Sequence, residues 1–146
     1  MDNQRTLQKT AELVRDGMFA NDRAAKALGI EIVAIAPGTA TLTMTVREDM
    51  LNAFDICHGG FVAALADTAF AFACNSYNEL TVTSCFGIDI VAPARHDDVL
   101  TAVCTEVNKA GRTGVSDVEV THQKGERVAV FRGRSYALKG KSAVAG

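Results

Sequence analysis

The stretch HGGFVAALADTAFAFACNSY, residues 58–77, has the longest uninterrupted helical pattern in the chain and is apolar on nearly all sides. A helix of this kind must be wrapped by other parts of the protein. Its one charged residue is Asp67. Moving an unpaired carboxylate out of water costs several kcal/mol, so a sequence that keeps one in its most apolar segment is usually using it. We therefore expect Asp67 to be the reactive group on a buried central helix.

Segments on both sides of this helix alternate between apolar and polar residues, as strands do. Residues 30–46 are divided by Pro37-Gly38, which is typical of a hairpin turn. After the helix come four β-rich runs separated by turn residues, at 81–92, 98–110, 113–123 and 127–138. The sequence therefore predicts an α+β protein in which about six antiparallel strands wrap around one helix.

The length of 146 residues and the hydrophobic share of 48% fit one compact domain. Residues 1–28 form an N-terminal helical segment, with an amphipathic helix around Arg5–Phe19 and a second turn around Asp22–Leu28. Residues 29–138 form the main domain. We expect the tail 139–146 to be disordered.

Composition excludes several classes of protein. The net charge is -2 and the basic residues are dispersed, which argues against a nucleic-acid partner. The four cysteines contain no CxxC pair and are typical of reduced core cysteines in a cytoplasmic protein, without a metal. The chain does not begin with the pattern of a secretion signal, and the central Asp of the apolar segment argues against a membrane span.

Residues 51–76, LNAFDICHGGFVAALADTAFAFACNS, and the order of the strands resemble the hotdog-fold acyl-CoA thioesterases of the PaaI type, associated with phenylacetate degradation. The shared pattern is Asn-x5-His-Gly-Gly-x5-Ala-Asp, and the resemblance extends over roughly residues 20–138. It implies an aryl- or hydroxyphenylacetyl-CoA substrate and no cofactor, since coenzyme A is part of the substrate. It also implies a homodimer, often paired into a homotetramer.

Thioester hydrolysis needs a base or nucleophile near the carbonyl carbon and donors for the developing oxyanion. A helix starting near Gly59 leaves the N–H groups of Gly59 and Gly60 unsatisfied at the positive end of its dipole. The resemblance gives Asp67 the role of general base or of nucleophile, and the sequence leaves both open. Because its helical neighbours are apolar, we expect burial to raise the pKa of Asp67 above its ordinary value of ~3.9.

The spacing of these two groups predicts a dimer independently of the resemblance. Asp67 follows Gly59 by eight residues, which places them roughly 12 Å apart along one helix. One carbonyl cannot contact both. A productive site therefore combines Gly59 of one chain with Asp67 of another, across a two-fold axis.

Other polar residues near the motif have two interpretations each. His58 either hydrogen-bonds the loop at the end of the helix or polarises the substrate carbonyl. Asn52 either orients the attacking water or holds its loop by an Asx-type bond. Related thioesterases place a hydroxyl on the next strand, and strand register decides whether Thr83 or Ser84 supplies it. Asp89 is expected to be a strand-face or interface residue.

The coenzyme A part of the substrate needs cations for its phosphates. The candidates are turn residues at strand ends, namely Arg95, His96, Lys109 and Arg112.

The acyl group is left open by the sequence. Four phenylalanines are candidates for an aromatic pocket: Phe54, Phe61, Phe70 and Phe72. A medium-chain aliphatic acyl group fits the same residues. A non-catalytic acyl-CoA-binding hotdog module is the alternative from another class, and it has no need of Asp67. A hotdog hydratase is disfavoured, because Asp67 lies in the middle of the helix.

Overall fold

The computed structural model describes the whole chain, residues 1–146, as four helical segments and six strands. The helical segments are α1 (Asp2–Asn21), α2 (Arg23–Ala27), the short 3-10 helix η1 (Glu48–Met50) and α3 (Gly59–Asn75). The strands are β1 (Glu31–Ala36), β2 (Thr39–Thr45), β3 (Thr81–Ile90), β4 (Val99–Ala110), β5 (Thr113–Thr121) and β6 (Arg127–Ala137). None of the helices has the length and apolarity needed to cross a membrane.

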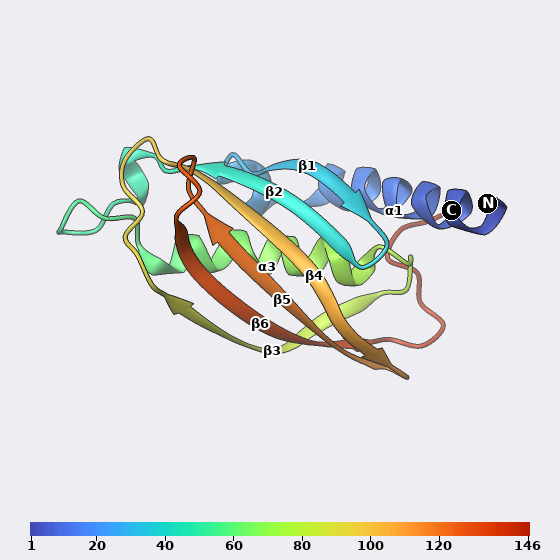
Figure 1. Cartoon of the computed structure of the whole chain (residues 1–146). Helices are drawn as coiled ribbons and strands as arrows, with labels where there is room; N and C mark the ends of the chain where they lie inside the picture. The colour runs from blue at the N-terminus through green and yellow to red at the C-terminus, as the bar shows by residue number, and fades with distance from the viewer.

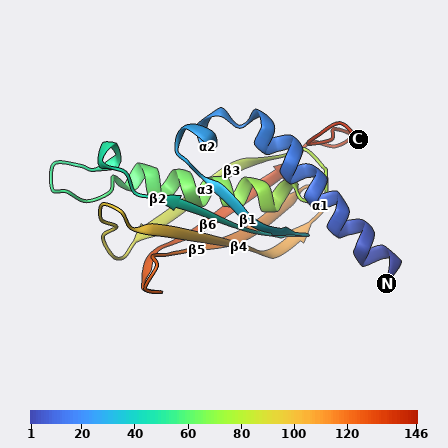
Figure 2. The same cartoon turned by 90° about the horizontal axis from the view of Figure 1, so that it is seen from above.

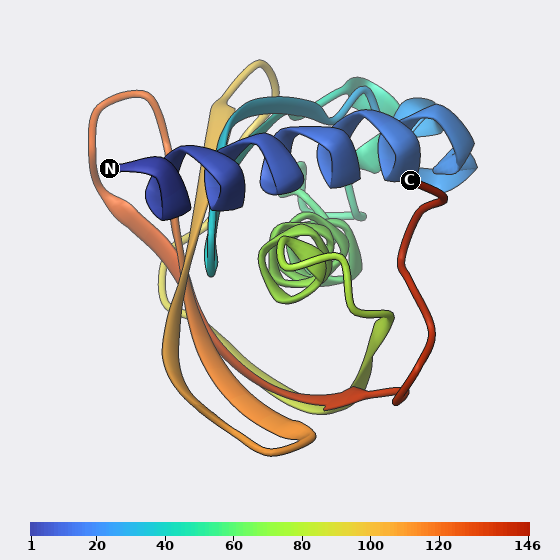
Figure 3. The same cartoon turned by 90° about the vertical axis from the view of Figure 1, so that its right-hand side faces the viewer.

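The strands form one antiparallel sheet in the order β1-β2-β4-β5-β6-β3. The sheet curls around α3, which contacts all six strands (Figure 1). Figure 3 looks along α3 and shows the sheet on two sides of it, α1 across a third and the C-terminal segment along the fourth. The predicted hotdog architecture of six strands around one helix is confirmed.

The core forms where α3 meets the inner face of the sheet. Leu65 and Phe72 of the helix are fully buried. Phe70 packs against Phe131 of β6, with ring centroids 5.7 Å apart. A Cβ atom on Gly133 would lie 2.8 Å from the ring of Phe70, so this glycine allows the ring to contact the β6 backbone. Close packing at this point fixes the distance between the helix and β6.

The N-terminal segment shares this core. Ala11 and Val14 of α1 are fully buried, and Gln8 donates a side-chain hydrogen bond to the carbonyl oxygen of Ile35 in β1 (2.9 Å). Figure 2 shows α1 crossing over the body beside β1 and α3. The helix extends a few residues beyond the predicted range at both ends, and Asp22 caps α2 by accepting from the N–H of Ala25.

The tail 139–146, which we expected to be disordered, has specific contacts instead. The N–H of Val144 donates to Oδ1 of Asn78, just after α3 (3.0 Å). The side chain of Val144 fills the space beside Gly17 of α1, where an added Cβ would lie 2.6 Å from it. A small apolar residue with a backbone partner gives this polar tail an anchoring point that its composition did not predict.

Candidate active site

Asp67 lies in the middle of α3 and is half-buried. The hydroxyl of Thr83 in β3 donates to its Oδ1 atom at 3.2 Å. Burial raises the pKa of the Asp67 carboxyl, and the Thr83 hydrogen bond offsets part of that rise because it stabilises the ionised form. No ion pair involves Asp67. The carboxylate is therefore oriented through one oxygen, while the other has no partner in the protomer.

A β-bulge in β3 decides which hydroxyl faces this carboxylate. The register with β6 shifts between Thr83 and Cys85, so Ser84 is the extra residue. Ser84 donates to the backbone carbonyl of Arg134 (3.2 Å) and not to the helix. Phe86 stacks on Phe131 at the inner face of the sheet. If the side chains of β3 alternated regularly from Phe86, Ser84 would face inward. Thr83 is therefore the hydroxyl beside Asp67, and the assignment of Ser84 to the site is corrected.

The start of α3 is open to a ligand. The helix begins at Gly59, and His58 in the N-cap position makes no side-chain capping bond. His58 and Gly60 are exposed and Gly59 is partly exposed. In the first turn, the N–H groups of both glycines have no acceptor within the helix. The backbone N–H of His58 donates to the carbonyl of Met50 (2.8 Å), but its side chain makes no hydrogen bond with the loop, and its role at the carbonyl stays a prediction.

Ile90, at the end of β3, contacts the start of α3. A Cβ atom on Gly59 would lie 2.7 Å from Cδ1 of Ile90, so the glycine allows the strand to pack closely here. Strand β3 thus runs antiparallel to α3, with Ile90 beside Gly59 and Thr83 beside Asp67. Sequence reasoning missed Ile90, although the apolar residues at 86, 88 and 90 indicated the inward face of the strand.

Asn52 holds the loop before α3. Its Oδ1 atom accepts hydrogen bonds from the N–H groups of Phe54 (2.9 Å) and Ile56 (3.2 Å). Its own N–H donates to the carbonyl of Ile56 (2.8 Å). Of the two interpretations, the structure therefore favours the Asx-type role, and Asn52 is a positioning residue for the loop.

The four candidate cations do not form one cluster within a protomer. Arg95 and His96 lie in the β3–β4 connection, where Ala94 accepts a backbone hydrogen bond from the loop before α3. Lys109 and Arg112 lie at the other end, in the β4–β5 hairpin. Strand β4 has 12 residues, which separate its ends by roughly 35 Å. One protomer therefore cannot hold a single phosphate with all four.

The two groups also differ in their neighbours. Lys109 lies 4.2 Å from the centroid of the Tyr77 ring, and its Nζ atom is 3.7 Å from Glu79. Arg112 donates to the hydroxyl of Tyr136 (3.3 Å). The exposed side chain of Arg95 makes no hydrogen bond or ion pair with the protein, so it is free to meet an anion.

The aromatic candidates separate by burial. Phe70 and Phe72 are core residues with about 1% exposure or less, so they do not line a pocket. Phe61 is partly buried against the core, and Phe54 is 79% exposed. Only Phe54 and Phe61 of the four are available to a ligand.

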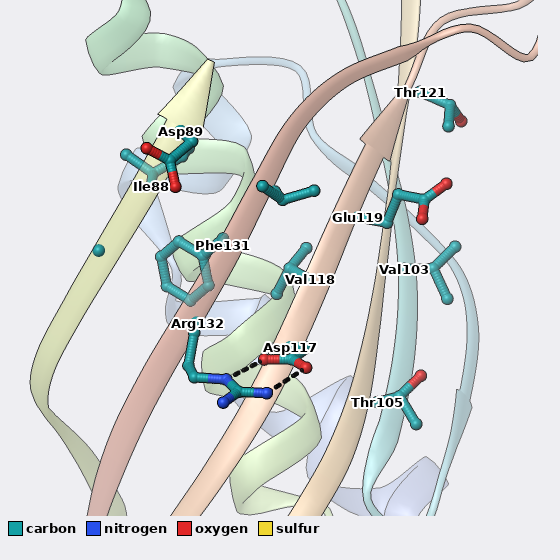
Figure 4. A pocket seen from close by; sticks show the side chains of 12 residues that line it. Ile88, Asp89, Val103, Thr105, Asp117, Val118, Glu119, Thr121, Phe131 and Arg132 are labelled. Carbon is teal, nitrogen blue, oxygen red and sulfur yellow. Dashed lines mark hydrogen bonds and ion pairs between the residues drawn. The ribbon is translucent and has the colours of Figure 1, made fainter. Parts of the chain in front are cut away.

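A wide groove of ≈ 1050 Å³ lies on the outer face of the sheet, away from α3 (Figure 4). There the guanidinium of Arg132 donates two hydrogen bonds to the carboxylate of Asp117 (2.6 and 2.8 Å) and lowers its pKa. Asp89 lines this groove. Asp67 and Gly59 do not, so the groove is separate from the candidate site.

Three comparisons relate this chain to known proteins. The model of the thioesterase superfamily matches residues 54–129. The acyl-coenzyme A thioesterase PaaI of Escherichia coli is 46% identical over 123 residues, which are 84% of this chain and 88% of that protein. Its structure superposes with a TM-score of 0.91, at 43% identity over 92% of this chain and 98% of that one. A hypothetical thioesterase of Streptococcus pneumoniae, solved with coenzyme A, has a TM-score of 0.74 at 27% identity over 77% and 91% of the two chains.

Proposed function

Because the chain belongs to the thioesterase superfamily, and within it to the acyl-CoA thioesterases of the PaaI type, we propose that it hydrolyses aryl- or hydroxyphenylacetyl-CoA to the free acid and coenzyme A. The observation that carries the proposal is the position of Asp67. Its carboxylate is held by Thr83 in the middle of α3, whereas the free N–H donors of the same helix are at Gly59, roughly 12 Å away. Each active site therefore takes Asp67 from one subunit and Gly59 from its partner.

In this site Asp67 acts on the thioester carbonyl. As a general base it takes a proton from a water molecule whose oxygen attacks the carbonyl carbon. As a nucleophile, its own oxygen attacks, and water then hydrolyses the resulting mixed anhydride. In both cases the N–H of Gly59 donates to the oxyanion, the carbon–sulfur bond breaks and the thiolate of coenzyme A leaves. The reaction needs no cofactor.

The free edge of β3 supports the dimer. This strand pairs with β6 on one side and has no partner on the other. Three apolar residues of this edge strand are exposed in the protomer, at 44% for Val82, 44% for Phe86 and 46% for Ile90. A long apolar edge strand is a template for pairing with another chain. We infer that two copies join β3 to β3, antiparallel, about a two-fold axis.

This pairing requires Thr83 and Ile90 to project to the same face of β3, and the bulge allows it. Directly opposed residues of an antiparallel pair project to the same face. Thr83 and Ile90 are an odd number of residues apart, so in a regular strand they would face opposite ways. The extra residue Ser84 returns Thr83 to the face of Ile90. With the axis at Gly87, Thr83 of each subunit then opposes Ile90 of the other.

That register brings the reacting groups together. Ile90 lies against Gly59, and Thr83 holds Asp67. Opposing Ile90 to the partner's Thr83 therefore carries the partner's Asp67 to the start of α3. The same two-fold axis places opposite ends of the two protomers side by side. The partner's β4–β5 hairpin therefore lies at the end of the protomer that carries Arg95. We infer that cations of both subunits surround the phosphates of coenzyme A.

A thiol-release assay over a panel of acyl-CoA substrates tests this function. Phenylacetyl-CoA and hydroxyphenylacetyl-CoA are expected to be hydrolysed with higher kcat/KM than octanoyl-CoA. Preference for octanoyl-CoA would favour the aliphatic alternative. Binding of acyl-CoA without release of thiol by the purified dimer would favour the non-catalytic module and contradict the proposed activity.

The rate is expected to depend on the ionisation of Asp67. Burial raises the pKa of this carboxyl, so its reactive ionised form is lost at a higher pH than for an ordinary Asp. Log kcat/KM should therefore fall with unit slope as the pH decreases through that raised pKa. The measurement is kcat/KM from pH 4 to 8, with circular dichroism at each pH. A flat profile over a folded protein would count against an ionised Asp67.

A further inference from the structure

Phe54 is exposed on a loop that is otherwise well ordered by hydrogen bonds. The loop closes at its base by a bridge between Leu51 and Cys57, and Asn52 bonds two of its backbone N–H groups. Asp55 at the tip has a positive φ of 57°, a conformation suited to a tight turn. The loop therefore presents a 79% exposed aromatic ring from a preorganised backbone. A contact made by such a ring loses little conformational entropy.

The location of the loop argues against the acyl group as the ligand of this ring. In Figures 1 and 2 the loop before α3 extends outward, past the ends of the sheet and of α3. Phe54 is three residues from Cys57 at the base of the loop, so the two are at most roughly 10 Å apart. In the proposed site the thioester carbonyl lies at Gly59, where Ile90 packs closely against the glycine and Phe61 is partly buried against the core. An acyl chain directed inward runs away from Phe54.

The coenzyme A part of the substrate runs the other way. It carries phosphates, so it leaves the site toward water and toward the free cation Arg95, which is in the connection bonded to the same loop. Pantetheine has apolar segments between its amides, and adenine has an aromatic face. An exposed aromatic ring suits both groups. Phe54 is thus on the outward path that the leaving group must follow.

Building on the proposed function, we propose that Phe54 is a binding residue for the coenzyme A moiety and that it makes no contact with the acyl group. This role differs from the one for which the sequence made Phe54 a candidate, the lining of an aromatic acyl pocket. It also gives a purpose to the hydrogen bonds of Asn52, which hold the ring in place. Discrimination among acyl groups then depends on the interior residues.

The test compares two thioesters with the same acyl group. Phenylacetyl-CoA carries the whole coenzyme, whereas phenylacetyl-N-acetylcysteamine keeps only the first amide of the pantetheine arm. Phe54→Ala is expected to raise KM for phenylacetyl-CoA about tenfold with kcat retained, the size of one lost aromatic contact. For the truncated thioester, kcat/KM should change by less than about twofold. Phe54→Tyr, which keeps the ring, should restore the wild-type KM.

The outcomes separate the alternatives. Equal loss of kcat/KM on both thioesters would place Phe54 at the acyl group and overturn the inference. Unchanged kinetics on both thioesters would also overturn it, because the ring would then contact neither part of the substrate. A lower sedimentation coefficient for Phe54→Ala would make the ring a subunit contact, with the same consequence. Val33→Ala, at another exposed apolar residue, is the control for surface changes. A wild-type enzyme inactive on both thioesters would refute the proposed function itself.

Discussion

Asp67→Asn is expected to lower kcat by roughly 10³-fold on the best acyl-CoA substrate, within the range that positioned general bases contribute. The amide keeps the size of the carboxylate and can still accept from Thr83, but it neither takes a proton from water nor forms an anhydride. Because KM reflects contacts with the rest of the substrate, it should change little. Steady-state kinetics of thiol release measures both constants. Activity within tenfold of wild type would remove Asp67 from the mechanism.

The same substitution should not reduce stability, which separates a catalytic loss from unfolding. Burial raises the pKa of Asp67 in the folded state, so the folded protein binds this proton more tightly than the unfolded chain does. The stability that this proton supplies is complete at low pH and is lost as the pH rises through the raised pKa. At neutral pH the ionised side chain thus costs stability. Asn is neutral, and the Tm of Asp67→Asn at pH 7 should equal or exceed that of wild type.

Removing the oxyanion donor is expected to cost roughly 10²–10³-fold in kcat. Gly59→Pro does so with little change elsewhere, because proline suits the first position of a helix. His58 already has φ -54° and ψ 133°, as a residue before proline requires. Since a Cβ at this position approaches Ile90, the variant is combined with Ile90→Val. The matched control, Gly59→Ala with Ile90→Val, keeps the N–H and should keep most of the activity.

Mixing two inactive variants tests whether the site is shared. Each mixed dimer of the Gly59→Pro chain and the Asp67→Asn chain has one site with both defects and one with neither. Random reassortment makes half of the dimers mixed, so activity should recover to about a quarter of wild type. The assay follows thiol release after subunit exchange in mild denaturant. No recovery, with mixed dimers demonstrated by mass spectrometry, would mean that each protomer contains its own complete site.

The helix and the strands could be predicted because their signals are local. A helix that is apolar on all sides must be buried by other elements. The alternating segments with turn residues between them indicate the strands that bury it. The isolated Asp67 and the paired glycines at the helix start were evident for the same reason. These positions follow from residue type and spacing alone.

The choice between Thr83 and Ser84 could not be predicted, because it depends on a bulge that appears only when β3 pairs with β6. The four candidate cations came from turns at both ends of β4, and the sequence could not show that one protomer keeps the two pairs roughly 35 Å apart. The role of Asn52 was ambiguous, because a side-chain amide can hydrogen-bond either a water molecule or the backbone of its own loop. In each case a pairing between distant segments decides the outcome.

The extra residue in β3 also affects the sites of a hybrid dimer formed with a related chain. A related hotdog protein with an uninterrupted edge could still align its strand against this one. Its hydroxyl would then project to the opposite surface, leaving the acid on that side without its orienting partner. In such a hybrid only this chain's acid would have an orienting hydroxyl, because Thr83 and Asp67 belong to the same chain, so only one of the two composite sites would be competent.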